Sequence, residues 1–79
     1  MKLVFHLPNE KDIELEVGLN MTALDLDDLI REKADFFICD PNFLIYIFKG
    51  KYMPRNEPIK EWNLKDGAEL SVSYTLMGG

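Results

Sequence analysis

The chain has 79 residues, of which 47% are hydrophobic, and its formal net charge is −5 at pH 7. This length predicts one domain whose core can form without disulfide bonds, and the single cysteine, Cys39, has no internal partner. The acidic balance argues against nucleic acid or an anionic membrane as a partner, and no apolar run approaches the ~20 residues that span a bilayer.

Two alternating segments open the chain. Leu3, Phe5 and Leu7 share one face of residues 1–7, and residues 12–17 alternate in the same way. This is the period of half-buried strands, and the turn residues from Pro8 to Lys11 predict a β-hairpin between them. His6 falls on the wet face, where we expect an ordinary solvated side chain.

An amphipathic helix follows. Thr22 is a good N-cap, and Ala23, Leu26 and Ile30 fall on one stripe, joined by Leu29. The spacing predicts a helix of about twelve residues. We expect its solvated side to carry the acidic residues Asp25, Asp27, Asp28 and Glu32.

The middle of the chain contains an irregular segment and a β-prone run. Phe36, Phe37 and Ile38 could cover the open end of a sheet or form a partner-facing patch, and we favour the first alternative. Residues 43–48 then form a strand. The turn Lys49-Gly50-Lys51 leads into a short strand at residues 52–53.

The last third of the chain predicts a short helical turn and a final strand. Ile59, Trp62 and Leu64 have the spacing of the turn, and residues 69–76 alternate between polar and apolar side chains. The order β-β-α-β-β-(short helix)-β predicts an α+β roll, a mixed sheet wrapped over one main helix, with the last strand parallel to the first. We expect one domain over residues 1–76, a flexible tail over residues 77–79, and no pocket for small-molecule chemistry.

Several segments together resemble the ubiquitin-like modifier family with its β-grasp fold. Residues 1–17 resemble the opening of ubiquitin without a gap, and Ile47-Phe48-Lys49-Gly50-Lys51 resembles its Ile-Phe-Ala-Gly-Lys. Trp62-Asn63-Leu64 is similar to its Tyr-Asn-Ile, and residues 75–79 are similar to its Gly-Gly tail. The resemblance covers the whole chain, with about three extra residues before the third strand.

The resemblance implies a modifier rather than an enzyme, with no cofactor and no metal. An E1-like activating enzyme would adenylate the carboxylate of Gly79, and an E2-like conjugating enzyme would carry the thioester to an amine of a target protein. Gly78 would let the tail enter a narrow site. Thr75, Leu76 and Met77 would be recognised by these enzymes. A deconjugating protease is a further implied partner.

The chain departs from ubiquitin where ubiquitin binds its receptors. The recognition patch of ubiquitin maps onto Pro8, Ile47, Ser71 and Ser73, of which only Ile47 keeps a large aliphatic side chain. Val4 and Ile45 would contribute to a smaller patch with Ile47. The tail also lacks the two arginines of ubiquitin, so we expect a dedicated activating enzyme.

Other assignments follow from the same resemblance. Lys11, Lys33 and Lys51 match ubiquitin lysines and are candidate acceptor amines. We expect a monomer in the cytoplasm, or also in the nucleus if the organism is eukaryotic. Two alternative functions stay open, a sulfur carrier with a C-terminal thiocarboxylate and a non-covalent ubiquitin-like adaptor domain.

Overall fold

The computed structural model describes residues 1–8, 10–33 and 42–76, and for residues 42–43 and 74–76 only the backbone. In these residues the predicted order of elements is confirmed. The elements are β1 (Lys2–His6), β2 (Asp12–Glu16), α1 (Ala23–Lys33), β3 (Asn42–Phe48), β4 (Lys51–Tyr52), the 3-10 helix η1 (Ile59–Trp62) and β5 (Ala68–Leu76).

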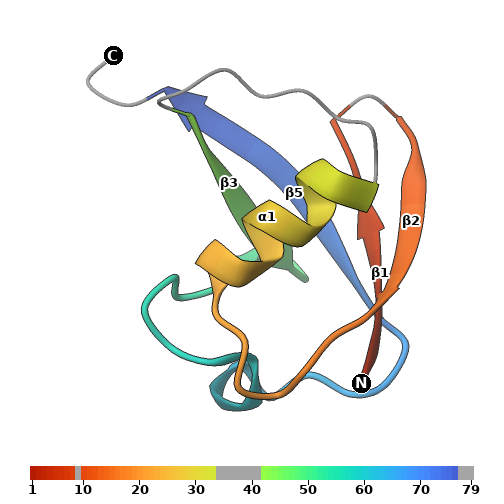
Figure 1. The fold of residues 1–79 in the computed structure, drawn as a ribbon, viewed down its shortest axis with the longest axis vertical. Helices are drawn as coiled ribbons and strands as arrows, with labels where there is room; N and C mark the ends of the chain where they lie inside the picture. The colour runs from red at the N-terminus through yellow and green to blue at the C-terminus, as the bar shows by residue number, and fades with distance from the viewer. Residues whose placement is uncertain (9, 34–41, 77–79) are drawn as a thin grey trace.

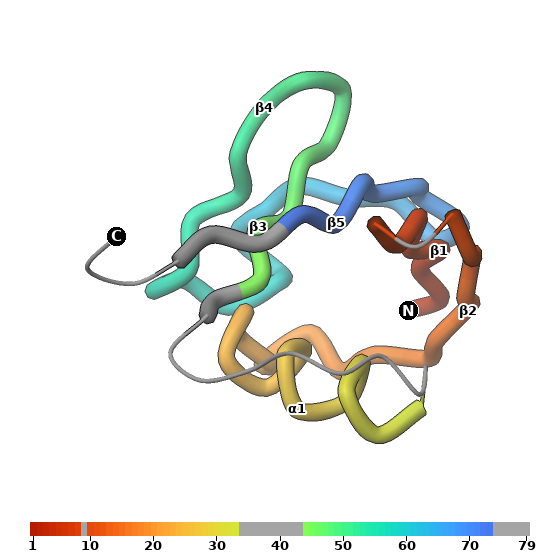
Figure 2. The backbone as a smooth tube through the Cα atoms, turned by 90° about the horizontal axis from the view of Figure 1, so that it is seen from above, coloured from red at the N-terminus to blue at the C-terminus, as the bar shows by residue number. Residues whose placement is uncertain are grey.

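The strands form one mixed sheet in the order β2-β1-β5-β3-β4. β1 and β5 are parallel, with Val4 opposite Glu69, whereas the other neighbouring strands are antiparallel. Helix α1 crosses one face of this sheet (Figure 1), so that helix and sheet form two layers (Figure 2). The α+β roll and its parallel first and last strands are therefore confirmed.

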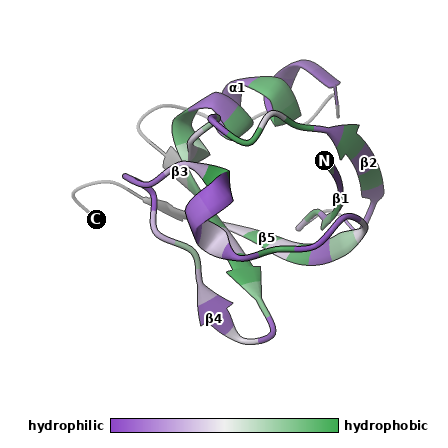
Figure 3. Ribbon diagram, turned by 90° about the horizontal axis from the view of Figure 1, so that it is seen from below, coloured by the Kyte–Doolittle hydropathy of each residue, from purple (hydrophilic) through white to green (hydrophobic). Residues whose placement is uncertain are grey.

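The core fills the space between the helix and the inner face of the sheet. Phe5 packs edge-on against Tyr46 with ring centroids 6.0 Å apart, and Tyr46 lies 6.1 Å from the ring of Trp62. Hydrophobic and hydrophilic bands alternate along β2 and α1 (Figure 3), as expected for elements with one buried side. η1 joins this core because Trp62 Nε1 donates to Pro54 O at 3.0 Å.

Helix α1 begins as predicted. Thr22 donates its backbone N–H to Asp25 Oδ2 at 3.0 Å, which is one half of a capping box. Ala23, Leu26 and Ile30 are fully buried on the inner side.

The prediction that Asp27 lies on the solvated side of the helix is wrong, because Asp27 is only 2% exposed. It follows Ala23 by four positions and precedes Ile30 by three, so that it shares their face.

The β3–β4 turn shifts the short strand by one residue. Lys49 and Gly50 have φ angles of 52° and 78°, as in a two-residue hairpin turn. This turn places Lys51 directly opposite Phe48, so β4 covers residues 51–52 instead of the predicted 52–53.

Phe36, Phe37 and Ile38 lie outside the described residues. Within the part of the chain that the structure describes, no helix has the length and apolar character needed to cross a membrane.

Candidate protein-binding surface

The outer face of the sheet, on the side away from α1, carries most of the predicted partner surface. Ile47 lies opposite Ser71 and Ile45 opposite Ser73 on the neighbouring strands β3 and β5. Both isoleucines are partly buried and both serines are exposed. The structure therefore brings these four predicted residues together as two cross-strand pairs, each with one apolar and one polar side chain.

Tyr52 adds an aromatic side chain to this face that sequence reasoning missed. It lies opposite Ile47 in the β3–β4 ladder, so the two side chains share a face. Tyr52 is 68% exposed, and the β3–β4 hairpin that carries it turns away from α1 (Figures 2 and 3). We define the outer patch as Ile45, Ile47 and Tyr52. The sequence feature that could have placed Tyr52 on this face is the two-residue turn, because it fixes the register between β3 and β4.

Val4 and Pro8 lie apart from the outer patch. Val4 is opposite Glu69 on β5, whereas Ile47 is opposite Ser71 two residues further along that strand. The charged and polar side chains of β5 thus separate Val4 from Ile47. Pro8 is exposed beyond the end of β1.

A polar cluster occupies the β1 side of the same face. His6 Nδ1 lies 2.7 Å from Asp12 Oδ1, and His6 Nε2 lies 2.7 Å from Glu69 Oε1. Carboxylates only accept hydrogen bonds, so both contacts are satisfied at once when both ring nitrogens carry a proton. The His6 side chain is 39% exposed, as expected of a solvated side chain, and its imidazole in addition joins β2, β1 and β5.

This cluster favours the charged form of the histidine. The hydrogen bond to Asp12 and then that to Glu69 raise the pKa of His6 above its usual value. The two carboxylates lie at opposite ring nitrogens, so they do not converge on a common point. Among the described residues, no three His, Cys, Asp or Glu side chains are arranged to hold a metal ion.

A buried polar network supports the outer patch from below. Tyr46 donates its hydroxyl to Asp27 Oδ1 at 2.7 Å, and Arg55 Nη2 donates to Asp27 Oδ2 at 2.6 Å. Arg55 Nη1 also donates to Leu44 O. Burial, and then the negative charge of Asp27, raises the pKa of Tyr46 well above its usual range, so its hydroxyl stays a donor. The network fixes α1 against the β3 residues that alternate with Ile45 and Ile47.

The predicted tail begins where β5 ends. Leu76 and Thr75 are the last residues of β5, and their backbone pairs with Asn42 and Phe43 of β3. The predicted residues Met77, Gly78 and Gly79 lie outside the described residues. The backbone of β5 is thus paired with β3 up to Leu76.

The candidate acceptor lysines lie on three different elements. Lys11 is in the β1–β2 turn, Lys33 ends α1 and Lys51 begins β4, and all three are exposed. The structure does not bring them together.

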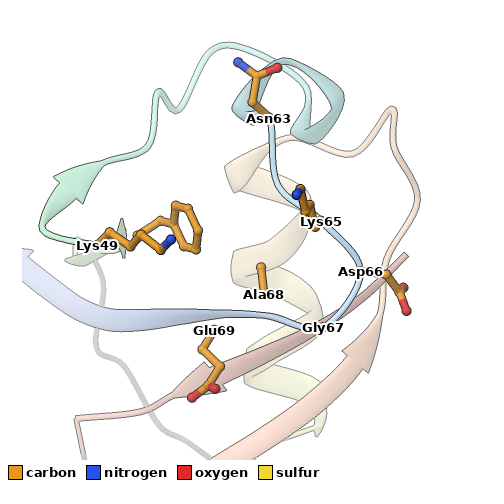
Figure 4. Close-up of a pocket in the computed structure, with 8 residues that line it drawn as sticks. Lys49, Asn63, Lys65, Asp66, Gly67, Ala68 and Glu69 are labelled. Atoms are coloured by element: carbon orange, nitrogen blue, oxygen red, sulfur yellow. The ribbon is translucent and has the colours of Figure 1, made fainter.

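A hollow of about 570 Å³ lies beside the start of β5 (Figure 4). The fold was expected to offer no pocket for small-molecule chemistry, and this hollow does not contradict that expectation, because most of its lining residues are exposed. The hollow forms because the loop after η1 lies next to the β3–β4 turn and leaves space between them. The hollow is lined by Phe48, Lys49, Asn63, Lys65, Asp66, Gly67, Ala68 and Glu69.

Comparisons with known proteins show the fold. No protein-family model matches the sequence, and no curated protein matches it. Among solved structures, a chain from a structure described as molecular mimicry of SUMO that promotes DNA repair matches with a TM-score of 0.79. The match has 18% sequence identity and covers 92% of this chain and 89% of that chain. The predicted ubiquitin-like β-grasp fold is therefore confirmed, and a fold does not by itself imply a function.

Proposed function

We propose that this chain, a ubiquitin-like β-grasp domain, is a protein modifier and not an enzyme. Its acyl donor is the carboxylate of Gly79. The observation that carries the proposal is the position of the glycine pair, two residues after the point where the central strand β5 ends at Leu76. In such a modifier the folded domain is recognised by partner proteins, and the C-terminal glycine carries the reacting carboxylate.

Glycine suits each step of this chemistry. An E1-like enzyme joins the Gly79 carboxylate to AMP, with release of pyrophosphate from ATP. A cysteine thiolate of that enzyme then displaces AMP to give a thioester, which passes to a cysteine of an E2-like enzyme. An amine of the target finally displaces the thiol and forms an amide bond. Without a side chain next to the acyl carbon, each attack meets little steric hindrance.

The outer patch is the surface on which we expect partners of the folded domain to bind. Aromatic and aliphatic side chains framed by polar residues are typical of binding sites for other proteins. Tyr52, Ile47 and Ile45 offer such a strip, with Ser71 and Ser73 along one side. Thr75, Leu76 and Met77, together with this face, would be bound by the activating enzyme, the conjugating enzyme and a deconjugating protease.

The outer patch also favours a second candidate, the non-covalent adaptor domain. An adaptor needs the same exposed strip but makes no use of Gly79. A sulfur carrier, in contrast, would use Gly79 but would carry a thiocarboxylate there. The three functions therefore differ in what happens to one carboxylate.

A comparison of two tagged chains in cells of the source organism separates these functions. One chain ends at Gly79 and the other lacks Gly78 and Gly79, so that both keep the complete described fold. After denaturing purification, a modifier gives additional species of higher mass only with the first chain. If both chains give the same species and bind the same non-covalent partners, the result would support the adaptor instead. A terminal exchange of oxygen for sulfur would support the carrier.

A further inference from the structure

The hollow beside β5 has two lysines on opposite walls and an apolar floor. Lys49 comes from the β3–β4 turn and Lys65 from the loop after η1, and the side chain of Ala68 points into the space between them (Figure 4). The ring of Phe48 adds to the apolar lining, with Lys49 Nζ 5.3 Å from its centroid. Both lysines are exposed, whereas Ala68 and Phe48 are partly buried.

The two carboxylates of the lining are held by other groups. Asp66 Oδ1 accepts the backbone N–H of Lys2 at 2.7 Å, and Glu69 Oε1 contacts His6 Nε2 at 2.7 Å. Figure 4 shows Asp66 and Glu69 directed away from the space above Ala68. The charges that face this space therefore belong to the lysines, on a chain whose net charge is −5.

The wall that carries Lys65 is fixed before any ligand binds. Gly67 N donates to Lys2 O at 2.6 Å, and Ala68 N donates to Lys65 O at 2.9 Å. Together with the Lys2–Asp66 bond, these contacts clamp the loop to the first residue of β1. A site that needs no rearrangement loses less free energy on binding.

We propose that this hollow binds an acidic peptide segment of a partner protein, with carboxylates at Lys49 and Lys65 and an apolar side chain over Ala68. Charge complementarity gives the sign of the ligand. A peptide fits better than a small molecule, because the walls are exposed lysine side chains instead of the enclosing polar groups that small-molecule sites use. The site lies beside the start of β5, whereas the proposed acyl donor follows its end, and the binding needs no activation of Gly79.

A titration of the unconjugated chain tests this site. The probe is the peptide acetyl-Asp-Leu-Glu-Leu-Asp-amide, and its neutral counterpart is acetyl-Asn-Leu-Gln-Leu-Asn-amide. We expect the acidic peptide to shift the backbone amide NMR signals of Lys49, Gly67 and Ala68, and the neutral peptide to bind much more weakly. Binding should also weaken as salt is added, because exposed charges are screened.

Matched variants locate the binding. The double variant Lys49→Gln, Lys65→Gln should lower the affinity for the acidic peptide by roughly five- to tenfold, as expected for the loss of two exposed ion pairs. Ala68→Leu should also lower this affinity, because the larger side chain would occupy the space above Ala68. Lys60→Gln removes an exposed lysine of η1 outside the hollow and should bind like the native chain.

Three results would overturn the proposal. They are equal binding of both peptides, no shift of the hollow's signals at millimolar peptide, or the same loss of affinity in Lys60→Gln as in the double variant. None of these results depends on whether Gly79 is conjugated, so this site and the proposed modifier function can fail separately.

Discussion

Arg55 Nη2 lies 2.6 Å from Asp27 Oδ2, and this ion pair joins the loop after β4 to the inner side of α1. The Asp27 side chain is 3% exposed, whereas that of Arg55 is 31% exposed. The carboxylate is therefore buried and depends on the guanidinium above it and on the hydroxyl of Tyr46.

Replacing Arg55 should expose this dependence. Arg55→Met keeps most of the volume but removes the charged hydrogen-bond donor from the buried Asp27 carboxylate, which costs about 3 kcal/mol. A domain of this size is stable by roughly 4 to 12 kcal/mol, so the loss is large. Chemical denaturation measures it, with Lys60→Met as a control that removes an exposed cation. Equal unfolding midpoints for the native chain and Arg55→Met would contradict the network.

The hydroxyl of Tyr46 can be tested with a matched pair of tyrosines. Tyr46→Phe removes the donor to Asp27 Oδ1, and an unsatisfied buried acceptor costs about 1 to 3 kcal/mol. Tyr52→Phe makes the same chemical change on an exposed side chain and should alter the free energy of unfolding by less than about 0.5 kcal/mol. Thermal unfolding of the two variants measures the contrast, and similar losses in both would argue against the buried bond.

The charged state of His6 should affect stability with a definite sign. Because the contacts to Asp12 and Glu69 raise the pKa of His6, they stabilise the fold most below the unfolded pKa of about 6.5. This contribution is lost as pH rises through the pKa of the folded state. The melting temperatures of the native chain and His6→Gln should therefore differ more near pH ~6 than near pH ~9.

An NMR titration of the His6 ring checks the same cluster directly. Its midpoint should lie above the usual value and should fall in Glu69→Gln, which removes the charge of one partner. A native midpoint at or below the usual value would show that the cluster does not hold His6 in its charged form.

Two strand serines should separate this domain from ubiquitin in receptor binding. We expect a receptor domain that binds ubiquitin to bind this chain at least about tenfold more weakly, since Ser71 and Ser73 interrupt an apolar surface. Ser71→Val with Ser73→Val should increase the affinity. Ser71→Thr with Ser73→Thr has nearly the same shape but keeps the hydroxyls, so calorimetry should show no gain. Native binding as tight as that of ubiquitin would contradict this account of the outer face.

Much of the fold follows from local patterns. The alternation of Leu3 and Phe5, the N-cap at Thr22 and the turn at Gly50 each have a local physical cause, so the strands, the helix and their order could be predicted. The burial of Asp27 was also within reach, because its spacing from Ala23 and Ile30 places it on the inner stripe.

The candidate site was harder to predict from the sequence, because it depends on contacts between distant segments. Arg55 reaches Asp27 from a loop with no periodicity, and Glu69 reaches His6 only because β1 and β5 are parallel in one particular register. Tyr52 joins the outer patch because the hairpin turn is one residue tighter than expected. Such contacts are fixed by tertiary packing, which a local pattern does not contain.

The central claim is that the carboxylate of Gly79 becomes joined to an amine of another protein. The most direct measurement is mass spectrometry of trypsin-digested conjugates from cells, with the chain lacking Gly78 and Gly79 as the control. Because no lysine or arginine follows Lys65, trypsin leaves the segment from Asp66 to Gly79 on the modified lysine. The proposal predicts branched peptides that carry this segment only with the intact chain. If the intact chain gives none and its Gly79 carboxylate is recovered free, the modifier function is contradicted.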